Sequence, residues 1–412
     1  MRILILHNRY QQAGGEDAVV ASECAMLQEH GHAVRLLEAN NDGIRGLGSK
    51  LRTSLECLYS HSSRRLVEAE LRAFRPEIVH AHNLFPVLTP SVLYACAEAG
   101  VPCVQTLHNY RWLCPGAILY REGATCEQCL TKRAAYPAVL HGCYRGSRMG
   151  TLPVAALAAI HLRTGLLERN VARFIVLSEF ARGKFIEGGL ASEKVCVKPN
   201  FLDRDPGVGA GAGGYVLYVG RLTEEKGIGV LLSTWRKLGR RIPLKIAGAG
   251  PMAEECRRAA EENFAIEYLG PRSPQEIFDL MGDAVALVFP SRCYETFGRA
   301  MIESFAKGTP VIASKLGAMA ELVEHGRTGL HFASGDGVEL AAQVEWMLAH
   351  PAEWNEIRRA AREKFESKYT AGRNHSMLME IYEQVIAGRS DYGGYCVYHD
   401  DGDSGFKKET SA

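Results

Sequence analysis

The chain has 412 residues, which is long enough for two domains of ordinary size that each have their own hydrophobic core. Its 47% of hydrophobic and 23% of charged residues are typical of a soluble globular protein, and a net charge of +1 gives no sign of a nucleic-acid-binding chain. The charge is uneven, because residues 1–204 hold 24 Lys and Arg against 18 Asp and Glu, and residues 205–412 hold 24 against 29. A basic front half favours an anionic partner or membrane surface, although ordinary surface variation explains it equally well.

No secretory or membrane-spanning segment is expected. Met1 and Arg2 lead directly into Ile3–Leu6, an apolar run that is too short for a signal peptide and is typical of a buried strand. No run approaches the roughly 18 apolar residues that a spanning helix needs. The twelve cysteines are scattered as in a reduced cytosolic chain. We therefore expect a cytoplasmic protein, and leave attachment to the inner face of a membrane open.

The first half of the chain alternates apolar runs with helical segments. Helices are expected at Asp17–Glu29, which ends at Gly31, and at Ser178–Glu187, where Ser178 is a good N-cap. This alternation predicts a parallel sheet covered on both faces. The predicted strands are Arg2–Leu6, His32–Glu38, Glu77–His82, Pro102–Leu107, Arg173–Leu177 and Lys194–Lys198.

The second half repeats this rhythm after the segment Pro206–Gly214 (PGVGAGAGG), which is a flexible linker by composition. Its predicted strands are Tyr215–Val219, Pro243–Ala247, Ala265–Leu269, Ala284–Phe289, Pro310–Ser314 and Gly329–Phe332. Two doubly wound domains then face each other across a cleft at the carboxyl ends of both sheets, where such folds bind ligands. The first domain is expected at 1–200, with an insertion at 109–150, and a hinge at 201–214 follows it. The second domain is expected at 215–370 and a C-terminal helix at 371–387. The tail 388–412 is expected to be disordered.

Two carboxylates stand eight positions apart in Tyr294–Glu303 (YETFGRAMIE). Eight positions do not return to the same helix face, so we expect Glu295 in a loop and Glu303 inside the helix that follows. The free backbone N–H groups of Phe297, Gly298 and Arg299 would open that helix and attract an anion. A carboxylate beside such a helix start indicates a ligand with both hydroxyl and phosphate groups.

Two cations follow the strand Tyr215–Val219, in the segment Gly220–Gly227 (GRLTEEKG). Arg221 and Lys226 lie at the carboxyl end of that strand, where they could neutralise a diphosphate and stabilise it as a leaving group. Alone, the pattern would more often be a solvated basic loop. Its position between a strand and a helix, together with the Glu295 segment, favours the phosphate site.

These segments resemble the motifs of the family 4 (group 1) retaining glycosyltransferases. GRLTEEKG is similar to the family's diphosphate loop, and the segment Tyr294–Ser314 is similar to its paired-glutamate segment. Ile246–Pro251 (IAGAGP) is similar to its Gly-Pro turn, and Val197–Asp203 (VKPNFLD) to the stretch that leads into its hinge. The matches run from residue 3 to about residue 385. The resemblance implies an α/β protein with the GT-B fold of two facing Rossmann-like domains. It also implies that the protein transfers a hexosyl group, with retention of configuration, from a nucleotide diphosphate sugar to a glycan or lipid-linked acceptor. The setting that it implies is cell-surface polysaccharide biosynthesis.

The resemblance also implies roles for individual residues. Arg221 and Lys226 would bind the donor diphosphate, Glu295 the sugar hydroxyls, and Glu303 the ribose. The amides of Phe297, Gly298 and Arg299 would bind sugar and phosphate oxygens, and the base would lie near Gly270 and Arg272. Arg299 departs from the aliphatic residue frequent there, which leaves an extra phosphate or acceptor contact, or a surface role, open.

In the first half, Gly14 and Gly15 resemble the family's mobile glycine loop, which closes over donor and acceptor. His108 follows the strand Cys103–Leu107 and corresponds to a histidine that contacts the donor sugar. His7 and His82 are weaker candidates for the cleft.

No side chain offers a convincing nucleophile, so we expect front-face attack in which the departing diphosphate takes the acceptor's proton. No cofactor is required, since the two cations do the work of a metal. The alternatives are a non-catalytic paralogue that binds nucleotide sugars and a GT-B epimerase of UDP-sugars. A dehydrogenase is disfavoured because His7, Asn8 and Arg9, rather than a Gly-rich turn, follow the first strand. The donor base, the sugar, the linkage and the oligomeric state stay undetermined.

Two further features stay open at this point. Cys114, Cys126, Cys129 and Cys143 lie in the insertion and could hold a structural zinc, with His141 as a spare ligand, or be four unconnected thiols. The apolar segment Thr151–Val171 could touch anionic lipid or could pack as a core helix. The arginines that would accompany lipid contact are Arg163, Arg169 and Arg173 with Arg64, Arg65, Arg72 and Arg75.

Overall fold

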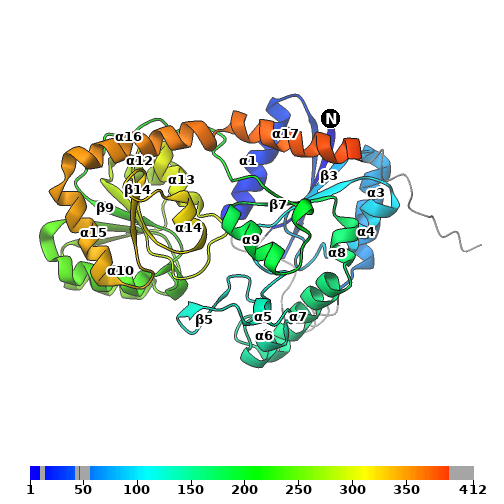
Figure 1. Cartoon of the computed structure of the whole chain (residues 1–412), viewed down its shortest axis with the longest axis horizontal. Helices are drawn as coiled ribbons and strands as arrows, with labels where there is room; N and C mark the ends of the chain where they lie inside the picture. The colour runs from blue at the N-terminus through cyan, green and yellow to red at the C-terminus, as the bar shows by residue number, and fades with distance from the viewer. Residues whose placement is uncertain (10–13, 42–45, 47–55, 389–412) are drawn as a thin grey trace, which may run out of the picture.

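The computed structural model contains two six-stranded parallel sheets, one in each half of the chain (Figure 1). It describes residues 1–9, 14–41, 46, 56–388, so the tail predicted at 388–412 lies outside the described residues except for Gly388. Every one of the twelve predicted strands is present, and the two-domain α/β prediction is confirmed.

The first sheet has the strand order β2-β1-β3-β4-β7-β8. Its strands are β1 (Arg2–Arg9), β2 (Ala33–Asn40), β3 (Ile78–Ala81), β4 (Cys103–Thr106), β7 (Arg173–Val176) and β8 (Val195–Val197). The helices around it are α1 (Gly15–Glu29), α3 (His61–Phe74), α4 (Ser91–Glu98), α8 (Leu166–Asn170) and α9 (Glu179–Glu187). As predicted, Ser178 caps α9, because its Oγ accepts from the N–H of Ala181 at 3.2 Å.

The insertion after β4 has secondary structure that the sequence did not predict. It contains the two-stranded hairpin β5 (Tyr120–Arg121) and β6 (Ala124–Thr125), and the helices α5 (Gln128–Thr131) and α6 (Tyr136–His141). The next helix, α7 (Arg148–Arg163), begins at the end of the insertion and covers most of the segment 151–171, for which a core helix was one of the two expectations. In Figure 1 these elements lie below the first sheet, and β5 extends toward the second half of the molecule.

The second sheet has the order β11-β10-β9-β12-β13-β14. Its strands are β9 (Val216–Val219), β10 (Leu244–Ala247), β11 (Ile266–Gly270), β12 (Ala286–Phe289), β13 (Val311–Ser314) and β14 (Gly329–Phe332). The helices around it are α10 (Ile228–Leu238), α11 (Ala253–Glu262), α12 (Pro274–Asp283), α13 (Arg299–Ala306), α14 (Gly317–Leu322), α15 (Gly337–Ala349) and α16 (Pro351–Lys368). Among the described residues, no helix is both long and apolar enough to cross a membrane.

The last helix, α17 (Ala371–Ala387), returns to the first half and lies beside α1 (Figure 1). Its residues Leu378, Ile381 and Tyr382 share one buried apolar cluster with Ile3 and Ile5 of β1. The C-terminal helix therefore belongs to the core of the first sheet and ties the two halves together.

The glycine-rich segment 206–214 is docked on the second half, which corrects the prediction of a flexible linker. The N–H groups of Gly209, Gly211 and Gly213 donate to backbone carbonyls of Lys307, Gly282 and Asp283 at 2.8–2.9 Å. A Cβ on Gly209 would lie 2.2 Å from the backbone of Gly282. These glycines allow two backbones to approach closely, a use that composition alone does not distinguish from flexibility.

Candidate functional site

A cavity of about 340 Å³ lies where the carboxyl ends of the two sheets face each other. The first half contributes Gly15, which opens α1, and His108, which follows β4. The second half contributes Arg221, Lys226 and Glu295. Five residues chosen from four separate stretches of the sequence are thus brought to one place.

Lys226 and Glu295 form the centre of the cavity wall. Lys226 ends the 3₁₀ turn Glu224–Lys226, and its Nζ lies 2.5 Å from Oε1 of Glu295. Ser291 Oγ donates to the same oxygen at 2.6 Å, so Oε2 is left to receive a ligand's hydroxyl group. Burial would lower the pKa of Lys226, but the Glu295 carboxylate outweighs it, and the pKa is raised. The lysine therefore carries its charge into the cavity.

The turn that carries Arg221 and Lys226 depends on glycine. Gly227 has φ +78°, and a Cβ there would lie 1.9 Å from the carbonyl oxygen of Pro290. The turn can therefore press against the end of β12, which brings Lys226 within reach of Glu295. Within the described residues Arg221 has no carboxylate partner, and its exposed side chain adds a second positive charge to the cavity.

The start of α13 also faces the cavity. As predicted, Glu295 precedes the helix and Glu303 lies inside it, with Gly298 as N-cap at φ +99°. Phe297, Gly298 and Arg299 all line the cavity, so backbone N–H groups and the positive end of the helix dipole are available to an anion. Arg299 Nε lies 2.9 Å from Oε1 of Glu303, four residues on. Burial raises the pKa of Glu303, and Arg299 opposes that rise.

Some predicted site residues lie outside the cavity wall. Glu303 lies behind Arg299, and Gly14 caps α1 next to the cavity residue Gly15. Gly270 ends β11, and Arg272 pairs with Glu276 at 3.5 Å.

Sequence reasoning missed five polar residues of the cavity wall. They are Glu16, Asn200, Tyr218, Ser291 and Thr296. Each stands next to a segment that was singled out: Glu16 follows Gly15, and Asn200 lies within the quoted stretch Val197–Asp203. Their closeness to a strand end or to the glycine pair is the signal that could have found them.

A buried chain of side chains leads from the first sheet to His108. Glu23 Oε1 lies 3.3 Å from Nε2 of His82, and His82 Nδ1 lies 2.9 Å from Nε2 of His108. Burial, with neighbouring His80, lowers the pKa of His82 to about 3, and burial with His82 lowers the pKa of His108 well below its ordinary value. His82 and His108 share one hydrogen bond, in which the nitrogen of one ring donates and that of the other accepts, so the tautomers of the two rings are linked.

Glu23 keeps its charge in this buried place because of Lys198. Burial would raise the pKa of Glu23, but Lys198 and His80 hold it well below the ordinary value. Lys198 Nζ lies 3.1 Å from Oε2 of Glu23 and 3.0 Å from Oδ1 of Asn374, on α17. Within the described residues, Glu23, His80 and His82 bring three atoms that could ligate a metal to within 4.8 Å of one another. The ammonium of Lys198 already supplies the cation that this group needs.

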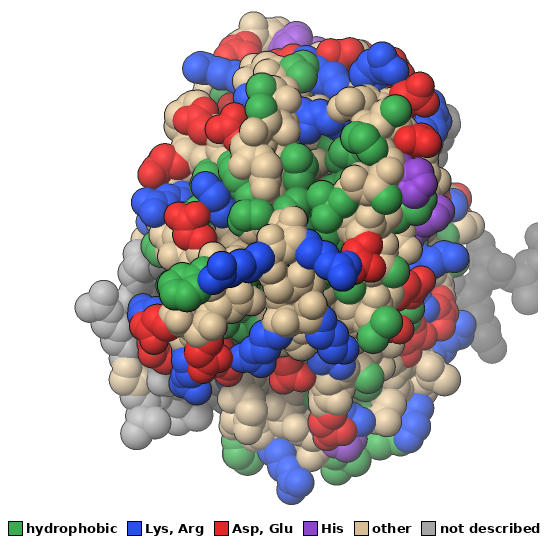
Figure 2. Space-filling model, turned by 90° about the vertical axis from the view of Figure 1, so that its left-hand side faces the viewer, with side chains coloured by type: hydrophobic (Ala, Val, Ile, Leu, Met, Phe, Trp, Pro, Cys, Tyr) green, Lys and Arg blue, Asp and Glu red, His purple; other side chains and the backbone are tan. Residues whose placement is uncertain are grey.

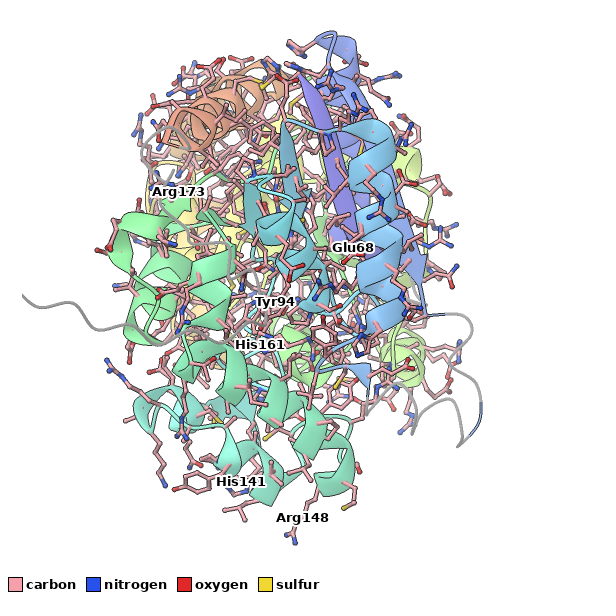
Figure 3. All side chains as sticks on the ribbon, turned by 90° about the vertical axis from the view of Figure 1, so that its right-hand side faces the viewer. Glu68, Tyr94, His141, Arg148, His161 and Arg173 are labelled. Carbon is pink, nitrogen blue, oxygen red and sulfur yellow. The ribbon has the colours of Figure 1, made fainter. Side chains whose placement is uncertain are left out.

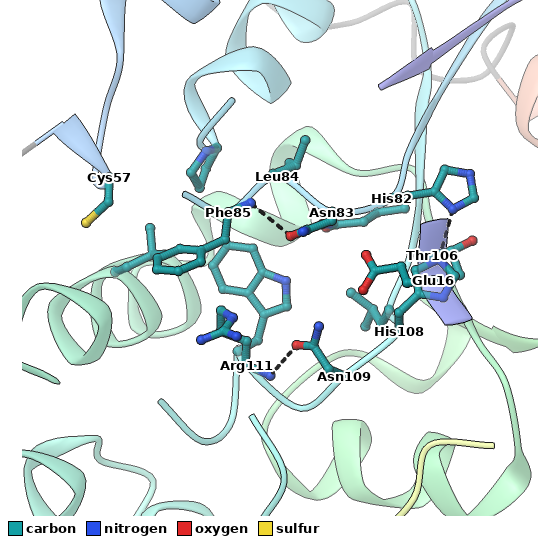
Figure 4. A pocket seen from close by; sticks show the side chains of 15 residues that line it. Glu16, Cys57, His82, Asn83, Leu84, Phe85, Thr106, His108, Asn109 and Arg111 are labelled. Atoms are coloured by element: carbon teal, nitrogen blue, oxygen red, sulfur yellow. Dashed lines mark hydrogen bonds between the residues drawn. The ribbon is translucent and has the colours of Figure 1, made fainter. Parts of the chain in front are cut away.

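A narrow crevice of about 40 Å³ lies beside the cavity on the side of the first half, and Figure 4 shows the side chains that line it. It shares Glu16 and His108 with the cavity. Phe85, Trp112 and Leu157 give it apolar walls, and Asn83, Asn109 and Arg111 bring polar groups to it. The crevice therefore combines aromatic surfaces with planar polar side chains.

Contacts across the cleft hold the two halves together on one side. Thr296 Oγ1 donates to the carbonyl oxygen of His108 at 2.8 Å, and Ser178 Oγ donates to that of Thr296 at 3.0 Å. The carboxylate of Glu321 accepts from the N–H groups of Glu179 and Phe180, at the start of α9. The loop that carries Glu295 is thus fixed to the strand end that carries His108.

Known protein families match both halves. Residues 13–206 match the family model described as Glycosyltransferase Family 4, and residues 213–350 match the model described as Glycosyl transferases group 1. The chain belongs to the group 1, family 4 type of GT-B glycosyltransferases. It is therefore an enzyme of the transferase class, as the sequence motifs predicted.

Individual relatives of this glycosyltransferase are distant. A glycogen synthase of Mycobacterium tuberculosis is 28% identical over 313 residues, which cover 72% of this chain and 66% of the relative. The D-rhamnosyltransferase WbpZ of Pseudomonas aeruginosa is 29% identical over 161 residues, 38% of this chain and 42% of the relative. The crystal structure of Anabaena Alr3699/HepE in complex with UDP has a TM-score of 0.65 at 18% identity and covers 93% of this chain and 100% of its own. This structural likeness confirms the GT-B fold.

The zinc hypothesis for the insertion of this glycosyltransferase gains no support. Within the described residues, Cys114, Cys126, Cys129 and Cys143 do not form a group whose sulfur atoms lie within 4.8 Å of one another. Burial raises the pKa of Cys114, of Cys143, and of Cys129 to about 12, so in the metal-free protein these side chains are thiols.

Proposed function

We propose that this glycosyltransferase moves a hexosyl group, with retention of configuration, from a nucleotide diphosphate sugar to a glycan or lipid-linked acceptor. The observation that carries the proposal is the cavity, because it combines two cations, a carboxylate and a helix start at one point. A diphosphate matches the cations and the helix dipole, and sugar hydroxyls match the carboxylate. The proposed setting is cell-surface polysaccharide assembly; one relative, from Erwinia amylovora, is named an amylovoran biosynthesis glycosyltransferase.

In this proposal the second half binds the donor. Arg221 and Lys226 hold the diphosphate, Glu295 receives hydroxyl groups of the sugar through Oε2, and the N–H groups of Phe297, Gly298 and Arg299 bind oxygens of sugar and phosphate. Glu303 receives the ribose hydroxyls, and the base lies near Gly270 and Arg272. The Anabaena neighbour, solved in complex with UDP-glucose, supports a donor of this class.

The first half, residues 1–200, would bind the acceptor, with the crevice beside His108 as its subsite. Gly14 and Gly15 would let the backbone at the start of α1 approach donor and acceptor. The acceptor hydroxyl would attack the anomeric carbon from the face that the diphosphate leaves. The bond between that carbon and the diphosphate oxygen breaks, the bond to the acceptor oxygen forms, and the proton passes to the departing diphosphate. A lipid-linked acceptor would place the enzyme in the cytoplasm, at the inner face of the membrane.

Slow hydrolysis of the donor tests this proposal without knowledge of the acceptor. The protein is incubated in turn with UDP-, GDP-, ADP- and dTDP-sugars, and the first-formed free sugar is observed by proton NMR before its anomers equilibrate. We expect release of the nucleoside diphosphate from one of these donors, and a sugar with the anomeric configuration that it had in the donor. An inverted product would contradict the front-face mechanism, and the absence of turnover with every donor would contradict the function.

A further inference from the structure

The helix α6 of the insertion and the helix α7 that follows it carry an unusual share of the exposed apolar surface. Among the described residues twelve large apolar side chains are exposed, and Tyr136, Leu140, Met149, Leu152 and Ile160 are five of these. Met149 is 79% exposed and Leu140 58%. The two helices pack against each other, so the five side chains belong to one part of the surface.

This part of the chain is also strongly basic. No Asp or Glu occurs from residue 128 to residue 167, and the same stretch holds five cations. They are Lys132, Arg133, Arg145, Arg148 and Arg163, and all five are exposed. Within the described residues none of the five has a carboxylate partner. We call these five cations and the five apolar side chains the α6–α7 face.

The pictures place this face at one end of the first half. In Figure 3, Arg148 and His141 lie at the lower tip and point away from the body of the molecule. Arg173 lies in the upper part of the same view, so it does not share this face, contrary to the expected grouping. Arg64 is engaged elsewhere, with Glu68 at 2.7 Å and with Glu98. By contrast, the far side of the second half mixes cations and carboxylates closely (Figure 2).

The α6–α7 face is joined to the cleft through α7. Leu157, on the buried side of α7, lines the crevice that lies beside the cavity. Leu152 and Ile160 lie on the exposed side of the same helix. Only the diameter of one helix, about 10 Å, therefore separates whatever covers the face from the crevice.

We propose that the α6–α7 face docks on an anionic lipid bilayer. Met149, Leu152 and Leu140 would enter the headgroup region, and the five cations would pair with lipid phosphates. A second copy of the chain fits less well, because a symmetric contact would set five cations against five without a carboxylate. The proposal does not rest on the proposed function, since binding to lipid needs neither donor nor acceptor.

Vesicle flotation of the full chain tests the docking. We expect the protein to float with vesicles of equal parts phosphatidylglycerol and phosphatidylcholine, and not with phosphatidylcholine alone. Each cation near an anionic surface contributes about a fivefold change in partitioning, so Arg145→Gln with Arg148→Gln should lower the partition coefficient about 25-fold. The matched control, Arg236→Gln with Arg257→Gln on the second half, should leave it unchanged.

A second pair of variants tests the apolar contribution. Met149→Ser with Leu152→Ser should also lower binding at least tenfold, whereas Phe264→Ser with Val338→Ser, at exposed apolar positions of the second half, should not. Circular dichroism checks that each variant is folded. Failure to bind anionic vesicles, or wild-type binding by both α6–α7 variants, would overturn the proposal. If the wild-type protein instead self-associates in light scattering, does not bind vesicles, and only the α6–α7 variants lose the self-association, the face is a protein contact.

Discussion

Replacing Lys226 by alanine is expected to lower kcat for glycosyl transfer by about a hundred- to a thousandfold. The ammonium lies in the cavity 2.5 Å from Glu295, at the place proposed for the departing diphosphate. Removing one fixed charge or donor that stabilises a developing anion has a cost of this size. Arg221→Ala should act in the same direction, because Arg221 is the other cation of the cavity wall. The measurement is steady-state kinetics with the donor that the hydrolysis experiment identifies.

A matched control separates this effect from a general loss of lysine charge. Lys237 lies near the end of α10, on the surface, and Lys237→Ala removes the same side chain away from the cavity. We expect its kcat to equal that of the wild type. If Lys226→Ala and Arg221→Ala, both shown to be folded, also turn over at the wild-type rate, the two cations do not stabilise the leaving group.

Replacing Lys198 by methionine is expected to destabilise the first half by about 3–5 kcal/mol. Lys198 is 2% exposed and its ammonium contacts the carboxylate of Glu23, which is 1% exposed. Without the ammonium, the buried carboxylate of Glu23 loses the partner that holds its pKa low. Removing one partner of a buried ion pair lowers the free energy of unfolding by about 3–5 kcal/mol, because the other charge is left buried without compensation. The free energy of unfolding, from urea denaturation followed by circular dichroism, measures the loss.

The double variant Glu23→Gln with Lys198→Met provides the control. The double variant removes both charges. Its loss of unfolding free energy should therefore be clearly smaller than the sum of the losses measured for the two single variants. Additive losses, or a Lys198→Met variant as stable as the wild type, would show that the pair is not coupled. Because Asn374 on α17 also contacts Lys198, the variant should in addition loosen the C-terminal helix.

Local patterns predicted most of the fold. Apolar runs bounded by glycine and by helix caps gave all twelve strands of the two sheets, because each buried parallel strand is a short apolar stretch followed by a helix. The same local logic separated Glu295, before α13, from Glu303, inside it. It also placed Arg221 and Lys226 at the carboxyl end of β9, where the cavity lies.

What the sequence could not show depends on contacts between distant segments. Glu23 and Lys198 are 175 positions apart, and neither has a local pattern that identifies its partner. The glycines of segment 206–214 were misinterpreted as flexible because close backbone approach and free rotation call for the same residue. Of the arginines grouped with the segment 151–171, Arg163 belongs to the α6–α7 face and Arg173 does not, because the sequence does not tell which helix ends share a surface.

The cavity between the two halves is the proposed site of a nucleotide diphosphate sugar. A thermal-shift screen with UDP-, GDP-, ADP- and dTDP-sugars tests this, because a ligand that binds only the folded protein raises its melting temperature. We predict that one of these donors stabilises the wild-type protein and that the double variant Arg221→Ala with Lys226→Ala loses this stabilisation. A donor that stabilises the double variant as much as the wild type would place the binding site elsewhere and contradict the assignment of the cavity as the donor site.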